Sequence, residues 1–142
     1  MTERILKLEK GLNFRDLGGY FTLTGKQVKW HKLVRAGDLS RLTVSDRRKL
    51  VEYGINCVID LRSKVEVRKL PDRVPHGVDY LELSLFQSDE AESELSLDKL
   101  NAFYAKNPRN GHLRMEQIYR RLVLNQQSVL AYQAFFKALV AN

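Results

Sequence analysis

The sequence predicts an α/β fold in which a mixed sheet is flanked by helices. Three observations lead to this fold class: a helix start at residues 42–46, a short apolar strand at 55–61 directly after that helix, and helical stretches between residues 96 and 140. A helix that leads closely into a buried strand is typical of parallel or mixed sheets. The chain has 142 residues, of which 44% are hydrophobic, and it is expected to form a single domain, 1–142.

Within this domain the sequence indicates a strand-rich part at 1–85, an acidic loop at 86–95 and a helical part at 96–142. The glycines at positions 18 and 19 indicate a tight turn or a close backbone approach. Residues 20–23 and 27–36 read as short strands joined by a turn at 24–26. We expect this hairpin to pack its aromatic residues inward, namely Tyr20, Phe21 and Trp30.

The following elements carry clear end signals. Thr43 and Asp46 form a pair like a capping box at a helix start, and Gly54 is a natural helix stop. Residues 55–61 are short, β-branched and almost uncharged, which predicts a buried strand. Residues 64–69 predict one or two helical turns before Pro71, and the alternation over 78–85 predicts another strand.

The carboxyl-terminal part is predicted to hold an exposed acidic loop at 87–94 and three helices. These helices are expected at 96–106, 111–125 and 128–140, with Pro108 and Gly111 lying between the first two. The last helix has a wide apolar stripe, and a helix with so much apolar surface needs a packing partner. We therefore expect the isolated chain to be marginally stable or to self-associate through residues 128–140.

The charge distribution bears on the choice of partners. A net charge of +7 favours an anionic partner such as phosphate groups, nucleic acid or an acidic membrane surface, although it also serves solubility. The excess is local, because residues 26–73 hold 13 Lys and Arg against 6 Asp and Glu, whereas residues 79–98 hold 7 Asp and Glu and no Lys or Arg. Nucleic-acid binding is a minor alternative, because inward packing explains the aromatic residues better than base stacking does.

The sequence gives no sign of membrane insertion or export. No run of about 18 apolar residues occurs, so no transmembrane segment is expected. The first ten residues alternate charged with apolar side chains and lack the apolar run of a secretory signal. A cytoplasmic location is the resulting expectation.

Three polar residues follow strand-like runs and are candidates for binding phosphate or substrate: Arg35, Asp60 and Arg62. Open α/β sheets place ligands at the carboxyl ends of their strands. Arginine binds phosphate through its planar fork, and Asp60 could hold an arginine in place or take part in proton transfer. The alternative is an Asp–Arg pair that only fixes a loop.

Other chemistry has less support. Arg15 and Asp16, which precede the two glycines, are interpreted as a structural clamp of a turn. Cys57 is the single cysteine and lies in the middle of a predicted strand. Ser63, not an arginine, stands six positions after it. Cys57 is therefore expected to be a core residue. The histidines are scattered and no glycine-rich nucleotide motif occurs, so neither a metal nor a cofactor is expected.

Three sequence blocks carry a family resemblance. They are Asn-Phe-Arg-Asp-Leu-Gly-Gly-Tyr at 13–20, Arg-Ala-Gly-Asp-Leu-Ser at 35–40 and Val-Ile-Asp-Leu-Arg-Ser at 58–63. In this order they resemble the amino-terminal half of a bacterial family of tyrosine and phosphoinositide phosphatases. The resemblance implies a tyrosine-phosphatase-like fold with Arg35, Asp60 and Arg62 near the phosphate. The signature positions it implies are Asn13, Arg15, Asp16, Gly18 and Gly19.

This family carries out its chemistry at a His-Cys-X5-Arg loop, whose cysteine forms a phosphocysteine intermediate and whose arginine grips the phosphate. No such loop occurs in residues 1–142, so no catalytic residue is assigned. The resemblance therefore implies an incomplete fold: the amino-terminal portion of a protein tyrosine, dual-specificity or phosphoinositide phosphatase, truncated and inactive alone. The alternative is a non-catalytic relative that binds a phosphorylated ligand or a partner.

Overall fold

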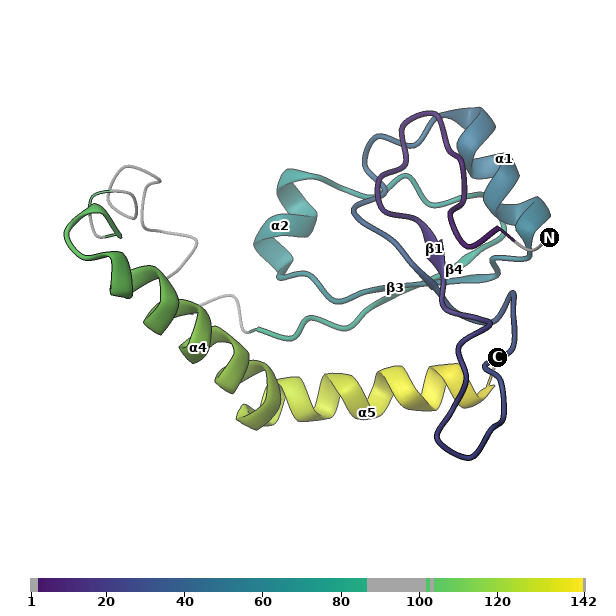
Figure 1. The fold of residues 1–142 in the computed structure, drawn as a ribbon. Coiled ribbons are helices and arrows are strands. Elements are labelled where there is room, and N and C mark those ends of the chain that lie inside the picture. Colours follow the sequence, from purple (N-terminus) through teal and green to yellow (C-terminus); the bar gives the residue numbers. More distant parts are fainter. Residues whose placement is uncertain (1–2, 87–101, 103, 142) are drawn as a thin grey trace. The chain divides into compact units, whose positions relative to one another are not determined.

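The computed structural model describes residues 3–86, 102 and 104–141, which divide between two compact units. The first unit comprises Met1–Val58 and Leu70–Leu81, and the second comprises Ile59–Lys69 and Glu82–Asn142. Short strands and helices alternate in the first 82 residues and two long helices follow, which confirms the α/β class (Figure 1). The predicted acidic loop at 87–94 and most of the predicted helix at 96–106 lie outside the described residues.

The first unit contains a small antiparallel sheet. In this sheet β1 (Arg15–Asp16) pairs with β2 (Val34–Arg35). Residues 19–30 between these strands form a second ribbon, which we call the 19–30 hairpin. Its strands meet at a bridge between Phe21 and Gln27, and the Thr22 N–H donates to the Lys26 carbonyl at 2.7 Å. The predicted turn at 24–26 is therefore present, although regular strand within 27–36 is confined to β2.

The expected inward packing of the hairpin's aromatic residues is wrong for two of them. Tyr20 is 55% exposed and Phe21 is 77% exposed, because a two-stranded ribbon has no second layer to bury its side chains. Trp30 is only partly exposed, since it packs against the glycine pair. A Cβ atom at Gly18 would lie 2.6 Å from the Trp30 Cα atom, so a close backbone approach requires this glycine.

Helix α1 (Val44–Tyr53) has the predicted ends. The Thr43 side chain accepts a hydrogen bond from the Asp46 N–H while Asp46 bonds back to the Thr43 N–H, which completes a capping box. Gly54 closes the helix in a left-handed conformation, with φ of 104°. The buried face of the helix packs through Leu50 into the core of the unit, whose other members are Phe14, Leu39 and Leu42.

Asp46 also holds the amino-terminal segment in place. Its carboxylate accepts hydrogen bonds from the backbone N–H groups of Glu9 at 2.6 Å and Lys10 at 3.0 Å. Burial alone would raise the pKa of Asp46, but these bonds and those from Thr43 outweigh burial and leave the pKa below its ordinary value. One carboxylate therefore caps a helix and anchors a segment that lies more than 30 residues earlier in the sequence.

A second two-stranded sheet is formed by β3 (Cys57–Asp60) and β4 (Asp79–Glu82). The Asp79 N–H donates to the Asn56 carbonyl and the Leu83 N–H donates to the Asp60 carbonyl, and this constant offset is that of parallel strands. The expected strand directions, antiparallel and parallel, are thus both present. In the described residues they occupy two separate sheets rather than one.

Helix α2 (Lys64–Lys69) follows β3, as the sequence predicted. The Ser63 hydroxyl and N–H both donate to the Glu66 carboxylate, at 2.7 and 2.9 Å, which fixes the helix start.

Within the described residues, no helix is long and apolar enough to cross a membrane.

The second unit also contains α4 (Pro108–Leu124) and α5 (Gln126–Ala141), which are separated by Asn125 alone and contact each other where they join (Figure 1). The prediction that Pro108 and Gly111 lie between helices is wrong. Asn107 caps α4 and proline takes a first-turn position, where its missing N–H costs no helical hydrogen bond. At the start of α5 the Ser128 hydroxyl, which is buried, donates to the Leu85 carbonyl at 2.7 Å.

Candidate anion-binding site

Two arginines face each other across the antiparallel sheet. Arg15 and Arg35 are direct partners in the register of β1 and β2, and both are exposed. Direct partners of an antiparallel pair project to the same side with Cβ atoms about 5 Å apart, and like charges placed there repel each other. Ion pairs among the described residues do not include either arginine. This arrangement is unfavourable by itself and becomes favourable when an anion binds between the two guanidinium groups.

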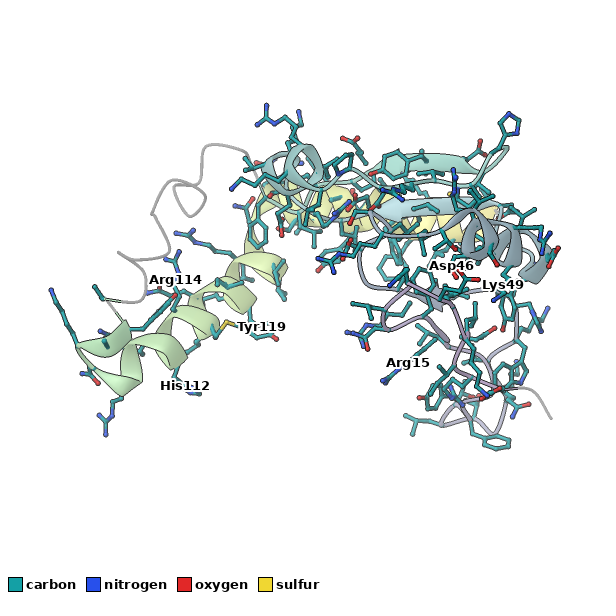
Figure 2. The ribbon with its side chains drawn as sticks, turned by 90° about the horizontal axis from the view of Figure 1, so that it is seen from above. Arg15, Asp46, Lys49, His112, Arg114 and Tyr119 are labelled. Carbon is teal, nitrogen blue, oxygen red and sulfur yellow. The ribbon has the colours of Figure 1, made fainter. Side chains whose placement is uncertain are left out.

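A shallow cavity of about 280 Å³ adjoins Arg15. Its polar lining comes from Lys7, Asn13 and Arg15, and Figure 2 shows the Arg15 side chain extending from β1. Asn13 takes a left-handed backbone conformation with φ of 58°, which asparagine tolerates better than most residues. The turn at Asn13 thus directs the chain so that a concave surface lies beside Arg15. The apolar part of the lining is Ile5, Leu6, Leu8, Gly11 and Phe14.

Asp16, the neighbour of Arg15, is fully buried and acts within the fold. Its carboxylate accepts hydrogen bonds from the Gly18 N–H at 2.6 Å, the His31 N–H at 2.8 Å and the Tyr53 hydroxyl at 2.6 Å. Burial by itself raises the pKa of Asp16, but the hydrogen bonds from these three groups outweigh burial and leave the pKa lowered. Asp16 therefore ties the signature turn to the hairpin and to the end of α1, and in doing so it positions Arg15.

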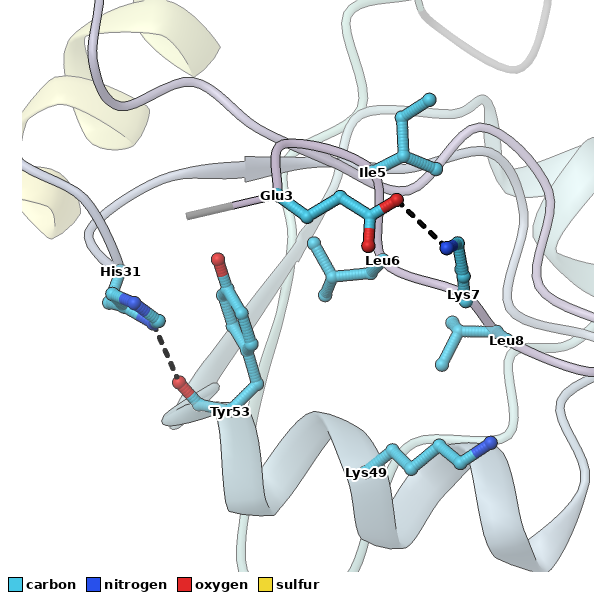
Figure 3. A pocket seen from close by; sticks show the side chains of 8 residues that line it. All are labelled: Glu3, Ile5, Leu6, Lys7, Leu8, His31, Lys49 and Tyr53. Carbon is cyan, nitrogen blue, oxygen red and sulfur yellow. Dashed lines mark hydrogen bonds and ion pairs between the residues drawn. The ribbon is translucent and has the colours of Figure 1, made fainter. Parts of the chain in front are cut away.

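A second cavity, of about 380 Å³, lies beside Tyr53 (Figure 3). The His31 ring packs against the Tyr53 ring with centroids 4.4 Å apart. Lys49 supplies positive charge to the lining, whereas Lys7 forms an ion pair with Glu3 at 3.0 Å. Burial and the hydrogen bond to Asp16 raise the pKa of Tyr53 to about 12. The phenol therefore stays protonated at neutral pH and serves Asp16 as a hydrogen-bond donor rather than acting as a base.

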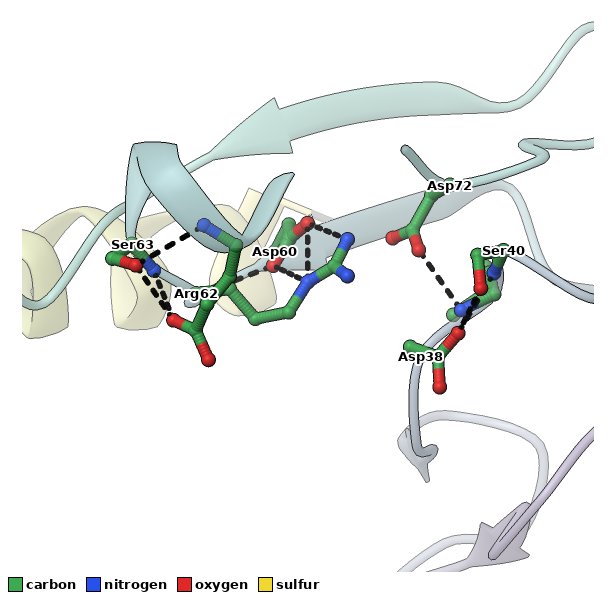
Figure 4. A network of polar contacts seen from close by, with 8 residues as sticks. Asp38, Ser40, Asp60, Arg62, Ser63 and Asp72 are labelled. Atoms are coloured by element: carbon green, nitrogen blue, oxygen red, sulfur yellow. Dashed lines mark hydrogen bonds and ion pairs between the residues drawn. The ribbon is translucent and has the colours of Figure 1, made fainter. Parts of the chain in front are cut away.

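Asp60 and Arg62 bind each other at the end of β3. Asp60 is buried, and its carboxylate accepts from the Arg62 Nη2 at 2.6 Å, from Nε at 3.0 and 3.1 Å, and from the Arg62 N–H at 2.9 Å (Figure 4). A guanidinium–carboxylate contact with several hydrogen bonds has a defined geometry. In this conformation the pair fixes the turn between β3 and α2. It lies in the second unit, whereas Arg35 lies in the first.

The loop after β2 is held by two further carboxylates, which are also drawn in Figure 4. Asp38 accepts hydrogen bonds from the N–H and the hydroxyl of Ser40, and Asp72 accepts from the Leu39 N–H at 2.9 Å. These contacts fix the chain that leads out of β2 at Arg35. They belong to the first unit, like the facing arginines.

Cys57 is partly buried within β3. Burial raises the pKa of its thiol, and the nearby Asp79 carboxylate raises it further. A nucleophilic cysteine requires the opposite environment, in which positive charge or a helix start stabilises the thiolate. Among the described residues, no group of three or more His, Cys, Asp or Glu side chains is placed to hold a metal ion.

The sequence indicated some members of this site and missed how they are combined. Arg35 was a candidate phosphate ligand, and Arg15 was assigned only to the signature turn, but the strand register places the two opposite each other. The link between Asp16 and Tyr53 was also missed, because these residues are 37 positions apart. No local sequence pattern predicts either pairing. The first depends on strand register, and the second depends on a hydrogen bond between residues far apart in sequence.

Comparison with known proteins adds an independent finding. A profile described as the tyrosine phosphatase family matches residues 6–142. A tyrosine-protein phosphatase from Nostoc commune is 27% identical over 105 residues, which cover 70% of this chain and 36% of that relative. The chain thus matches about a third of the length of the Nostoc protein.

Proposed function

The chain belongs to the tyrosine phosphatase family, and we propose that it forms the amino-terminal portion of a phosphatase that hydrolyses phosphomonoesters through a cysteinyl-phosphate. The family match spans residues 6–142, and the match to the Nostoc protein covers 36% of that protein. Phosphorylated proteins are the substrate class that the family suggests, and phosphoinositides are the other class that we propose.

The facing arginines are the observation that carries this proposal. Arg15 and Arg35 are held opposite each other on a short antiparallel sheet. Two arginine side chains at directly opposed positions can both reach the oxygens of one phosphate group, and the hydrogen bonds of Asp16 keep one strand in place. In this proposal Arg15 and Arg35 bind substrate phosphate in the first unit. In the second unit Asp60 holds Arg62, a further candidate phosphate ligand, at the turn between β3 and α2.

We propose that these 142 residues do not supply the nucleophile. Cys57 is their single cysteine, its thiol pKa is raised, and Ser63 stands where a phosphate-gripping arginine would be needed. Phosphocysteine chemistry needs both a thiolate and backbone N–H groups that cradle the phosphate. The chain alone should therefore not hydrolyse an aryl phosphate above background. Turnover that persists through purification and disappears in Cys57→Ser would contradict this part of the proposal.

Binding of inorganic phosphate tests the arginine pair directly. Titration calorimetry at low salt should show weak binding that falls about tenfold in Arg15→Gln or Arg35→Gln, because each substitution removes one charge-assisted contact. Arg62→Ala should also reduce binding if Arg62 reaches the phosphate. Arg68→Gln, which changes an exposed arginine at the end of α2, is the matched control. Equal binding by Arg35→Gln and the unsubstituted chain would remove the facing pair from the site.

A second candidate function is a non-catalytic relative that binds a phosphorylated ligand or a partner. The environment of Cys57 favours it, because a facing arginine pair without a thiolate can bind phosphate but cannot cleave the ester. Sequencing the coding DNA past the codon for Asn142 separates the two candidates. An in-frame or frameshifted Cys-X5-Arg stretch would support the phosphatase, and its absence would support the binding protein.

Self-association through residues 128–140 is part of the same proposal. Several apolar side chains of α5 are exposed, with Phe136 at 62% and Val140 at 89%. Apolar surface of this kind is a contact site for further polypeptide, either another part of the phosphatase or a second copy of the chain.

A further inference from the structure

The 19–30 hairpin is exposed along almost its whole length. Every residue from 20 to 29 is exposed, and the apolar side chains are concentrated toward the turn. Leu23 in the turn is fully exposed and Phe21 is 77% exposed. Packing within the first unit does not explain why apolar side chains of this size lie at the exposed end of a ribbon. A contact surface explains them better.

Positive charge follows this apolar turn along the chain. Lys26, Lys29 and Lys32 follow it in sequence, and no Asp or Glu occurs between residues 17 and 37. Lys26 and Lys29 are exposed, as is Lys32, and the ion pairs found among the described residues involve none of the three. The hairpin therefore combines an apolar end with a cationic returning strand, and no carboxylate lies nearby in sequence to neutralise this charge.

Contacts within the first unit also fix the conformation of the hairpin. Backbone hydrogen bonds join Gly19 to Val28, Val28 to Tyr20, and Thr22 to Lys26, at 2.7–2.9 Å. At its base the Arg4 guanidinium stacks 3.8 Å from the centroid of the Tyr20 ring and lies 5.4 Å from that of the Trp30 ring. Because the ribbon is preformed, binding through its end costs little conformational entropy.

We propose that the 19–30 hairpin docks onto an anionic lipid bilayer, with Phe21 and Leu23 entering the interfacial region and the three lysines binding lipid headgroups. Charge complementarity selects an anionic surface. The aliphatic Leu23 at the most exposed position selects lipid over nucleic acid, whose bases require aromatic stacking partners. This contact would attach the chain to a bilayer whether or not the chain takes part in phosphate chemistry.

Co-sedimentation of the full chain with vesicles tests the proposal. We expect binding to phosphatidylcholine vesicles that contain phosphatidylserine, little binding to phosphatidylcholine alone, and weaker binding as salt rises. Leu23→Ser and Phe21→Ser should each lower partitioning about tenfold, because each loses the transfer of a large apolar side chain. Lys26→Gln and Lys29→Gln should each lower partitioning roughly fivefold.

Two matched variants serve as controls. Val44→Ser removes another exposed apolar side chain of the same unit, and Lys69→Gln removes an exposed lysine at the end of α2. Both should partition like the unsubstituted chain. All the substituted side chains are exposed, so unchanged circular dichroism is expected and distinguishes lost docking from lost folding.

Three results would overturn the proposal. The first is equal binding to vesicles with and without phosphatidylserine. The second is partitioning that falls with salt but is unaffected by Leu23→Ser, which would mean adsorption by charge alone. The third is binding of a soluble single-stranded oligonucleotide that competes with anionic vesicles and is likewise unaffected by Leu23→Ser, which would identify the surface as a nucleic-acid contact.

Discussion

At the scale of single residues, buried carboxylates organise the first unit. Asp16 and Asp46 are both fully buried, and each accepts three hydrogen bonds, two of them from groups distant in sequence. Hydrogen bonds to an ionised carboxylate are stronger than those between neutral groups, and a buried donor without a partner is costly. The structure of the Arg-Asp-Leu-Gly-Gly segment at 15–19 therefore depends on the Asp16 carboxylate as much as on the two glycines.

Replacing Asp16 by asparagine should lower the free energy of unfolding by about 2–3 kcal/mol at pH 7, because three donors lose a charged acceptor. Since the folded-state pKa of Asp16 is lowered, its contribution is fully present above the unfolded-state pKa, near 4, and is lost as pH falls through the folded-state value. Urea unfolding at pH 7 and in acid measures both effects. Tyr53→Phe, which removes one of the three donors, should cost about 1 kcal/mol. Equal losses for Asp16→Asn at both pH values would contradict this role.

The hydroxyl of Tyr53 should titrate above the ordinary pKa of a tyrosine side chain. Burial and the Asp16 carboxylate raise its pKa to about 12, so the phenol should remain protonated at pH 11. The difference in phenolate absorbance between the unsubstituted chain and Tyr53→Phe isolates this one group. In Asp16→Asn the Tyr53 pKa should move toward its ordinary value, because the charge and the acceptor are lost together. Ionisation of Tyr53 near pH 10 in the unsubstituted chain would show that the hydrogen bond is absent.

At the scale of elements, local signals were sufficient for some structures and not for others. The ends of α1 could be predicted because Thr43, Asp46 and Gly54 act within a few residues of one another. The start of α4 was misplaced because proline was interpreted as a breaker, although it is favourable in the first turn of a helix. The opposition of Arg15 and Arg35 could not be predicted, since antiparallel register depends on the whole intervening hairpin.

Asp46 should contribute more to stability than the helix cap Thr43, because it also anchors the amino-terminal segment. Thr43→Ala removes the cap interaction and an exposed hydrogen bond from the Thr43 hydroxyl to the Glu9 side chain, and it should cost about 1 kcal/mol. Asp46→Ala also removes the acceptor for the Glu9 and Lys10 N–H groups, so its cost should reach about 3 kcal/mol. Chemical denaturation measures both values. Hydrogen exchange at Glu9 and Lys10 should accelerate in Asp46→Ala but remain slow in Thr43→Ala. Equal exchange in the two variants would show that Asp46 does not anchor the amino-terminal segment.

At the scale of the whole molecule, the long helices of the second unit leave large apolar side chains exposed. One face of α4 forms a shallow groove of about 680 Å³, whose apolar lining is Met115, Tyr119, Val123 and Leu124. Figure 2 shows Tyr119 and His112 on one side of this helix and Arg114 on the other side. Exposed apolar helix faces of this kind are covered in stable assemblies. The requirement for a packing partner, inferred from the α5 sequence, thus extends to α4.

The isolated chain should therefore self-associate in a concentration-dependent way. Sedimentation velocity should show a rising average mass as concentration increases, and the effect should strengthen with salt, because salt screens repulsion between chains that carry a net charge of +7. Phe136→Ser and Val140→Ser should shift the equilibrium toward monomer, since each removes exposed apolar area from α5. Gln133→Ser changes an exposed polar residue of the same helix and should leave association unchanged. A chain that remains monomeric at high concentration and unfolds cooperatively at high temperature would show that the exposed surfaces of α4 and α5 need no partner.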